Sequence, residues 1–284
     1  MSGTVKGTTR VAGVFGFPVS HSQSPAMHNS AFAQMGLDIV YVPFGVHPDN
    51  LKAAVAGIRA LDMVGVNVTI PHKEQVMQYL DWISEEARQI RSVNTIHHIY
   101  GELRGYSTDG EGFIRALKAS GKDPTGSKAV ILGAGGSARA TAYALVTNGA
   151  EVTVANRTFN RAVELADLLN KAVNPVALDS EDARRAIREA DLLVNCTSVG
   201  MHPKADDQPI PPDWLHGDLF VFDQIYNPLE TRLLGAGRMA GCQTANGVKM
   251  LVFQGAVSFE IWTGKTPPVE VMETAILEGL RSRP

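Results

Sequence analysis

Residues 128–138 of the chain read KAVILGAGGSA, a short apolar run that leads directly into a glycine-rich turn. Gly133, Gly135 and Ala138 match the G-x-G-x-x-G/A pattern of dinucleotide-binding folds. In that pattern the first glycine permits a tight turn, the second lets the backbone approach a pyrophosphate, and the third small residue lets the helix pack on its strand. A turn that merely connects two elements is the alternative. Because an apolar strand precedes the turn and a helical pattern follows it, we expect a dinucleotide at the helix N-terminus.

The kind of dinucleotide is indicated by the residues after the next predicted strand. NAD-binding versions usually carry Asp or Glu about 20 residues after the first glycine. This chain has Asn156, Arg157 and Thr158 there, with Arg161 one helical turn further on. A carboxylate would repel a 2′-phosphate, whereas a guanidinium can pair with it. A solvated basic helix start is the alternative, but arginine is electrostatically unfavourable at a helix N-terminus, so we expect NADP.

Apolar periodicity on both sides of this stretch alternates between strands and helices. Downstream, the predicted strands are 151–155, a segment near 176, 192–196 and 219–222, and the predicted helices are 159–172 and 181–189. Upstream, strands are predicted at 10–15, 39–44 and 64–70, a hairpin at Tyr100-Gly101, and helices from an N-cap at Ser24, over 49–61 and over 74–80. Two helices, 249–262 and 268–280, end the chain. This alternation predicts an α/β fold with parallel or mixed sheets.

The composition is that of an ordinary globular protein. Of 284 residues, 44% are hydrophobic and 19% charged, with a formal net charge of −3, which argues against disorder and against a nucleic-acid-binding surface. The sequence has no membrane-length apolar run, a polar N-terminus and only two cysteines, Cys196 and Cys242. The eight histidines form no metal-binding pattern, because His97 and His98 would face opposite ways on a strand. We therefore expect a soluble cytoplasmic protein with no metal, membrane or nucleic-acid partner.

Three polar clusters in the N-terminal half suggest a binding site. SQSP at 22–25 places two hydroxyls at a helix start, where capping explains one of them. NVTIPHKE at 67–74 places polar groups and a lysine at the carboxyl end of an apolar strand, where open α/β sheets bind ligands. A strand with one polar face would look similar. The third cluster combines SVNT at 92–95 with STDG at 107–110, where Asp109 could simply cap the following helix.

Together with GAGGSA at 133–138, NRT at 156–158 and DQIYNP at 223–228, these motifs resemble the shikimate dehydrogenase family, over about Val11 to Leu280. The resemblance implies an oxidoreductase that reversibly reduces 3-dehydroshikimate to shikimate with NADPH, in chorismate and aromatic amino-acid biosynthesis. It also implies two α/β domains with the catalytic cleft between them. A mixed-sheet substrate-binding domain would span 1–110 plus 248–284, and a Rossmann-type NADP-binding domain 111–247. The sequence does not distinguish a monomer from a homodimer.

The same resemblance assigns the site residues. Lys73 and Asp109 would form the catalytic pair. The substrate would be held by polar side chains, namely Ser22, Ser24, Thr69, Asn94, Asp109, Tyr226 and Gln254. The cofactor would be held at the pyrophosphate by Gly133, Ala134, Gly135, Gly136 and Ser137, at the adenosine ribose phosphate by Asn156, Arg157, Thr158 and Arg161, and near the nicotinamide by Gln224 and Gly247. The roles of Glu85 and His72 stay open.

A few positions depart from the family pattern. Ser107 stands where Asn is common, Ser92 where Ala is common, and Gln224 replaces a usual aliphatic residue beside the nicotinamide. Relatives that use NAD or accept quinate tend to carry an acidic residue where this chain has Thr158, which favours NADP and shikimate. Two alternatives remain: a quinate/shikimate dehydrogenase with broader substrate or NAD use, and a non-catalytic NADP-binding sensor of the same fold. Retention of the lysine and aspartate of the catalytic pair argues against the sensor.

Overall fold

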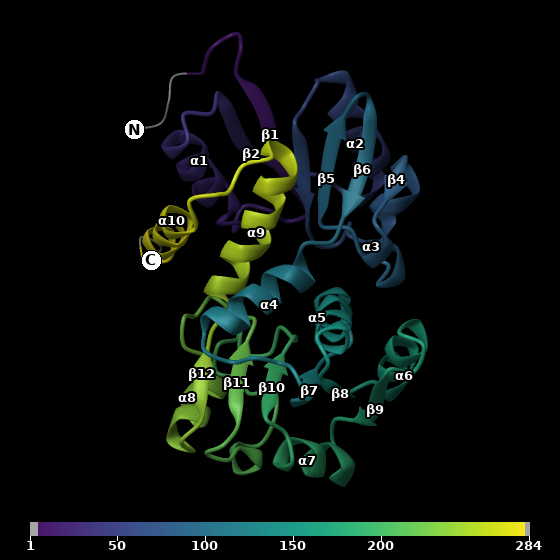
Figure 1. Ribbon diagram of the computed structural model, residues 1–284, viewed down its shortest axis with the longest axis vertical. Helices are drawn as coiled ribbons and strands as arrows, with labels where there is room; N and C mark the ends of the chain where they lie inside the picture. Colours follow the sequence, from purple (N-terminus) through teal and green to yellow (C-terminus); the bar gives the residue numbers. More distant parts are fainter. Residues whose placement is uncertain (1–4, 282–284) are drawn as a thin grey trace. The chain divides into compact units, whose positions relative to one another are not determined.

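The computed structural model describes residues 5–281, and the chain divides into two compact units, each with its own sheet (Figure 1). Unit 1 comprises the residues up to Thr108 and those from Val252 onward, and unit 2 comprises Asp109–Leu251. The second boundary lies inside one continuous helix, α9 (Val248–Thr263). The predicted α/β class is confirmed, with one mixed and one parallel sheet.

Unit 1 is built on a mixed sheet with the strand order β2-β1-β3-β5-β6-β4. The strands are β1 (Arg10–Gly16), β2 (Ile39–Gly45), β3 (Gly65–Val68), β4 (Trp82–Ile83), β5 (Thr95–Ile99) and β6 (Glu102–Tyr106). β1 pairs parallel with β2 and β3, whereas β5 pairs antiparallel with β3 and β6. The predicted hairpin between β5 and β6 is confirmed, and its turn residues Tyr100 and Gly101 have the positive φ values, 52° and 80°, that a two-residue turn favours.

Helices cover both faces of the unit 1 sheet. On one face, apolar side chains of α2 (Leu51–Ala60) and α3 (Glu85–Gln89) pack on those of the strands, Val66 and Ile96 among them. On the other face lie α1 (Ser24–Gln34), the unit 1 part of α9, and α10 (Val269–Arg281), which packs beside α1 (Figure 1). There the Trp262 indole N–H donates to the Ile96 carbonyl at 3.0 Å, in space that a Cβ at Gly65 would occupy.

Unit 2 contains a fully parallel sheet with the strand order β12-β11-β10-β7-β8-β9. The strands are β7 (Lys128–Leu132), β8 (Glu151–Asn156), β9 (Val173–Ala177), β10 (Leu192–Asn195), β11 (Phe220–Asp223) and β12 (Gln243–Ala245). Counted from β7, this is the 3-2-1-4-5-6 order of the doubly wound dinucleotide-binding fold. The order reverses between β7 and β10, and ligands of such sheets bind outside the carboxyl ends of the strands at this point.

Five helices lie wholly within unit 2: α4 (Asp109–Ala119), α5 (Gly136–Thr147), α6 (Phe159–Leu168), α7 (Glu181–Arg188) and α8 (Arg232–Met239). Side chains of α7 and α8 pack on one face of the sheet, where Val130, Leu193 and Val221 form a buried layer. Phe113 of α4 meets Phe222 of β11 edge to face, with ring centroids 5.2 Å apart. The core of unit 2 includes Leu132, the last residue of β7, and the glycine-rich turn follows it directly.

Several predicted boundaries are wrong, each for a local reason. The strand predicted over 64–70 ends at Val68, shortly before Pro71, which has no N–H for a sheet ladder. The helix predicted over 159–172 ends at Leu168, because Asn170 and Lys171 take positive φ values of 53° and 61°. The short helix predicted over 74–80 is present, as a 3₁₀ helix over Gln75–Tyr79.

The predicted cap of α1 is also wrong. Gln23 is the N-cap and makes no side-chain capping bond, while Ser24 is already the first helical residue. The Ser22 hydroxyl accepts from the Ser24 N–H at the helix start, so capping accounts for Ser22 but not for Ser24. The prediction missed β4, α3, α8 and β12, which are short or, in α8, diluted by two glycines.

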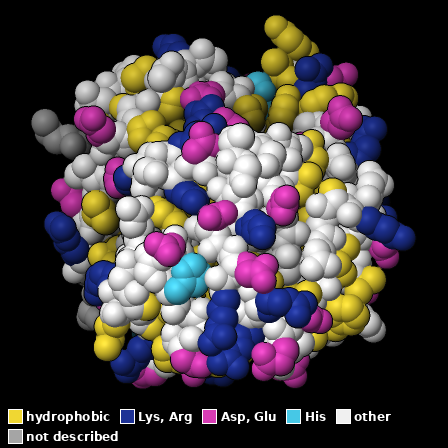
Figure 2. Space-filling model, turned by 60° about the horizontal axis from the view of Figure 1, so that its bottom comes forward, with side chains coloured by type: hydrophobic (Ala, Val, Ile, Leu, Met, Phe, Trp, Pro, Cys, Tyr) yellow, Lys and Arg dark blue, Asp and Glu magenta, His cyan; other side chains and the backbone are white. Residues whose placement is uncertain are grey.

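Charged side chains of both signs alternate on the face drawn in Figure 2, without a broad patch of one sign. Among residues 5–281, no helix combines the length and the apolarity needed to cross a membrane. Within the same range, no group of three or more His, Cys, Asp or Glu side chains is arranged to hold a metal ion.

Candidate functional site

The glycine-rich turn joins β7 to α5 with the geometry that a dinucleotide requires. Gly133 has a φ of +107°, a backbone conformation that residues other than glycine rarely adopt. Gly135 is the N-cap of α5, and a Cβ there would meet no protein atom within 4 Å. Protein packing thus gives no reason for glycine at this position, whereas a closely approaching phosphate would. Ala138 is fully buried, as expected for the third small residue. The residues present therefore fit a dinucleotide whose pyrophosphate lies on the N–H groups at the start of α5.

The residues after β8 leave two guanidinium groups available. Asn156 ends the strand, and its amide donates to the Thr158 carbonyl at 2.8 Å, which shapes the turn into α6. Thr158 is the N-cap of α6 but makes no side-chain capping bond. Arg157 and Arg161 are exposed, and neither pairs with a carboxylate among residues 5–281. A 2′-phosphate would give both charges a partner.

The residue after β11, Gln224, is joined to the first turns of α5. Its side-chain carbonyl accepts a hydrogen bond from the Ser137 hydroxyl, and its amide donates to the Thr141 hydroxyl at 2.7 Å. Gly247 lies directly against this segment, because its N–H donates to the Ile225 carbonyl at 2.9 Å and a Cβ would clash with the Gln224 carbonyl. The structure therefore brings together Ser137, Gln224 and Gly247 of the predicted cofactor set.

In unit 1, the segment after β3 holds Thr69 and Lys73. A Cβ at Gly16 would clash with the Thr69 methyl group, so the β1 and β3 ends pack closely here. His72 is 1% exposed, and its Nε2 lies 2.7 Å from the Val46 carbonyl oxygen. The Lys73 carbonyl accepts from the Val93 N–H at 2.8 Å. The Lys73 side chain is half-buried. Its backbone is held by its own carbonyl bond to Val93 and by the side-chain contact of the preceding His72.

Asn94 lies in a buried hydrogen-bond network, which we call the amide network and which also contains Asn67, Thr95, Thr108 and Ser258. The Asn94 side chain accepts from the Thr108 N–H at 2.8 Å and donates to the Thr108 hydroxyl at 2.9 Å. The Asn67 amide donates to Thr95 at 3.1 Å and to Ser258 at 3.0 Å, and Thr95 and Ser258 are 2.8 Å apart. The network joins β3, β5 and α9, so it fixes the orientation of Asn94.

Other predicted substrate residues lie around this network or in unit 2. The Gln254 side-chain oxygen is 3.5 Å from the Asn94 amide nitrogen. Ser22 and Ser24 are half-buried neighbours, and the Ser24 N–H donates to the Ser22 hydroxyl at 3.3 Å. Asp109, 6% exposed, follows Thr108 of the network and is the first residue of α4. Tyr226 is half-buried and belongs to unit 2.

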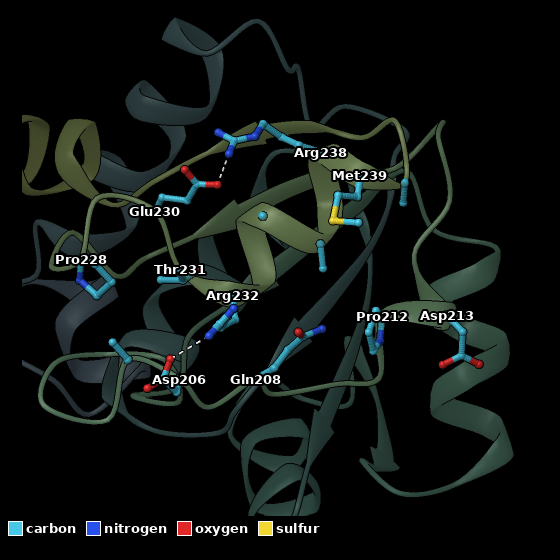
Figure 3. Close-up of a pocket in the computed structure, with 14 residues that line it drawn as sticks. Asp206, Gln208, Pro212, Asp213, Pro228, Glu230, Thr231, Arg232, Arg238 and Met239 are labelled. Carbon is cyan, nitrogen blue, oxygen red and sulfur yellow. Dashed lines mark hydrogen bonds and ion pairs between the residues drawn. The ribbon is translucent and has the colours of Figure 1, made fainter.

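The structure buries several polar residues for which the sequence motifs predict no role: Thr141, Asn195, Asp223, Thr231 and Ser258. All five are polar residues in strands, helices or turns that otherwise bury apolar side chains, which is the signal that could have marked them. A hollow of about 1100 Å³ in unit 2 is lined in part by α8 (Figure 3). Its arginines already pair with carboxylates, Arg232 with Asp206 and Arg238 with Glu230, so we assign it no ligand.

These features define a two-unit α/β protein of the dinucleotide-dependent dehydrogenase class, in which unit 2 carries the dinucleotide fold and unit 1 presents a lysine and buried amide groups. Comparison with known families is consistent along the chain. The family model of the shikimate dehydrogenase substrate binding domain matches residues 14–96, that of shikimate/quinate 5-dehydrogenase matches 116–203, and that of the shikimate 5'-dehydrogenase C-terminal domain matches 247–277. The chain belongs to the shikimate dehydrogenase family.

Individual relatives agree over the full length. An NADP(+)-dependent shikimate dehydrogenase of Methanopyrus kandleri is 49% identical over 288 residues, with 99% of each chain covered. A shikimate dehydrogenase solved in complex with NADP+ has a TM-score of 0.93 at 42% identity and covers 99% of both chains. The Thermus thermophilus enzyme, solved with NADP(H) and shikimate, has a TM-score of 0.89 at 38% identity and covers 96% of this chain and 100% of that one. The predicted family is therefore confirmed.

Proposed function

We propose that this chain catalyses the reversible NADPH-dependent reduction of 3-dehydroshikimate to shikimate, a step of aromatic amino-acid biosynthesis. The observation that carries the proposal is the match to NADP-dependent shikimate dehydrogenases across both units at up to 49% identity. The open position at Gly135 and the two unpaired arginines after β8 supply independent support for a phosphorylated dinucleotide. Both cysteines are free thiols, which suits the reducing cytoplasm in which we place the reaction.

The proposed catalytic pair is Lys73 and Asp109. When bound, NADPH supplies the hydride. As the ketone becomes an alcohol, negative charge grows on its oxygen, and an ammonium group at Lys73 stabilises that charge and donates the proton. In the reverse direction the neutral amine accepts the proton from the hydroxyl. Asp109 orients the lysine and a substrate hydroxyl.

The remaining substrate-binding side chains are proposed to form hydrogen bonds with the hydroxyl and carboxylate groups on the substrate ring. Ser22, Ser24, Thr69, Asn94, Gln254 and Tyr226 are uncharged hydrogen-bonding residues, as a polyhydroxylated ring requires. The amide network keeps Asn94 in one orientation, so its amide is preorganised rather than ordered on binding. A site of this kind rejects analogues that lack a hydroxyl, because its own buried polar groups would be left unpaired.

The adenosine end of the cofactor is proposed to lie over the turn after β8. Asn156 and Thr158 shape that turn, and Arg157 and Arg161 pair with the 2′-phosphate. Gly133 to Ser137 hold the pyrophosphate, and Gln224 and Gly247 lie beside the nicotinamide.

A spectrophotometric assay of the purified chain tests the proposal with four combinations: shikimate or quinate, each with NADP+ or NAD+. We expect the highest kcat/KM with shikimate and NADP+. Equal turnover of quinate, or of NAD+, would replace the proposal by a broader quinate/shikimate dehydrogenase. Absence of turnover in all four, together with NADP+ binding by calorimetry, would leave a binding protein and refute the enzyme.

A further inference from the structure

Asp223 is a fully buried carboxylate at the carboxyl end of β11. It accepts three hydrogen bonds, from the Asn195 amide at 3.0 Å, the Ile225 N–H at 3.1 Å and the Thr231 hydroxyl at 2.7 Å. All three donors are neutral, and no lysine or arginine among the described residues pairs with it. Burial raises the pKa of Asp223 to about 6. A buried charge without a cation is unfavourable, so these three hydrogen bonds are what hold the carboxylate at this position.

The three donors come from segments that surround the predicted cofactor position. Asn195 ends β10, beside the point where the strand order reverses, and its own oxygen accepts from the Thr197 N–H and hydroxyl. Thr231 is the N-cap of α8 and accepts from the Leu234 N–H at 3.3 Å. Ile225 follows Gln224 directly. One carboxylate therefore joins the end of β10, the start of α8 and the segment that begins at Gln224.

The Gln224 side chain in turn contacts the cofactor loop. It accepts from Ser137, which we propose at the pyrophosphate, and donates to Thr141 one turn further along α5. On its other side the backbone of Gln224 and Ile225 is pressed against Gly247. A shift of this segment would move Ser137 and the start of α5 relative to the strands.

We propose that Asp223 is a positioning residue for NADP, acting through Gln224: it fixes the Gln224–Ile225 backbone so that the Gln224 side chain holds Ser137 and α5 in the binding geometry. This inference rests on the proposed function, because it concerns the same cofactor site. Asp223 is not proposed to contact the cofactor itself. Its carboxylate suits the task because two oxygens can accept from three converging donors.

The test is a double-mutant cycle on the dissociation constant of NADP+, measured by calorimetry with Asp223→Ala, Gln224→Leu and the double variant. We expect Asp223→Ala to weaken NADP+ binding by roughly tenfold, the equivalent of one or two hydrogen bonds. In the Gln224→Leu background the same substitution should have little further effect, because its route to the cofactor is already lost. Asp223→Asn, which retains the oxygen that accepts from Asn195 and Ile225, should restore most of the affinity.

The matched control is Asp191→Ala. Asp191 lies at the other end of β10 and also accepts a backbone hydrogen bond, from the Lys128 N–H at 2.8 Å, so the same substitution should leave NADP+ affinity unchanged. Multiplicative effects of Asp223→Ala and Gln224→Leu, or an unchanged dissociation constant in Asp223→Ala, would overturn the inference. If Asp223→Ala does not fold, Thr231→Val removes one donor without changing side-chain shape and enters the same cycle. Failure of the parent chain to bind NADP+ would refute the proposed function instead.

Discussion

The Nε2 atom of His72 lies 2.7 Å from the backbone carbonyl oxygen of Val46, which ties the residue before Lys73 to the segment after β2. A carbonyl oxygen can only accept a hydrogen bond, so Nε2 is the donor and carries a proton. We expect His72→Phe, which keeps a ring but loses the bond, to lower kcat for shikimate oxidation by about tenfold. The KM for NADP+ should stay near the parent value.

The control for this prediction is His98→Phe. The His98 ring also bonds a backbone carbonyl, that of Met63 at 3.1 Å, but it is not adjacent in sequence to a proposed catalytic residue. Equal losses of kcat in both variants would show that His72 has only a structural role.

Lys73 itself is expected to be required for catalysis. Lys73→Ala should lower kcat by roughly 10²–10⁴-fold, the usual range for a positioned acid–base group. Steady-state rates with saturating shikimate and NADP+ give the value, with the exposed Lys52→Ala of α2 as control. A near-parental kcat would remove Lys73 from the proposed role.

Cofactor selectivity is expected to depend on Arg157. Arg157→Asp should weaken NADP+ binding by on the order of 100-fold and leave NAD+ binding nearly unchanged, because only NADP+ carries the phosphate with which the guanidinium pairs. Calorimetry with both dinucleotides measures the ratio. Arg188→Asp is the control, since Arg188 is also exposed and unpaired among the described residues but lies on α7. Equal losses for NADP+ and NAD+ would contradict the phosphate assignment.

Two buried serines should respond oppositely to the same substitution. The Ser92 hydroxyl is buried with no hydrogen-bond partner among the described residues, whereas Ser258 bonds within the amide network. We expect Ser92→Ala to stabilise the protein by about 1 kcal/mol and Ser258→Ala to destabilise it by about 1–3 kcal/mol, because the latter leaves buried partners unsatisfied. Urea unfolding monitored by circular dichroism tests both signs. A destabilised Ser92→Ala would indicate a partner for that hydroxyl.

His28 should make unit 1 sensitive to acid. The ring is fully buried, stacks on Tyr41 at a centroid distance of 4.5 Å, and has no hydrogen-bond partner for either nitrogen among residues 5–281. Burial lowers its pKa from 6.5 to about 3. Between these values the unfolded chain binds a proton that the folded chain does not, so the stabilisation is complete above pH 6.5 and is lost as the pH falls towards 3.

The measurement is the free energy of unfolding between pH 7 and pH 4 for the parent and His28→Phe. The variant should lose less stability than the parent over that range, by on the order of a few kcal/mol. Parallel pH profiles would show that His28 does not titrate in this way.

Structural features that depend on short stretches of sequence could be predicted. The glycine-rich turn, the arginines after β8 and most strands follow from local patterns, and the motif order identified the family. The amide network could not be predicted, since Asn67 and Ser258 are 191 positions apart and meet only when α9 packs on β3 and β5. Asp223 was overlooked for the same reason, because its three partners come from β10, the start of α8 and its own strand end. The wrong cap at Ser24 shows that a favourable residue type does not decide which residue first becomes helical.

The return of the chain to unit 1 at Val252 has a consequence during synthesis on the ribosome. Unit 2 is complete once residue 251 has emerged, but unit 1 still lacks α10 and most of α9 at that stage. Until they arrive, the Ile96 carbonyl has no indole donor and the amide network has no Ser258. The segment made first is therefore finished last. A nascent chain stopped before α9 would expose the face of the unit 1 sheet that α9 covers, and that face would be open to aggregation or to chaperones.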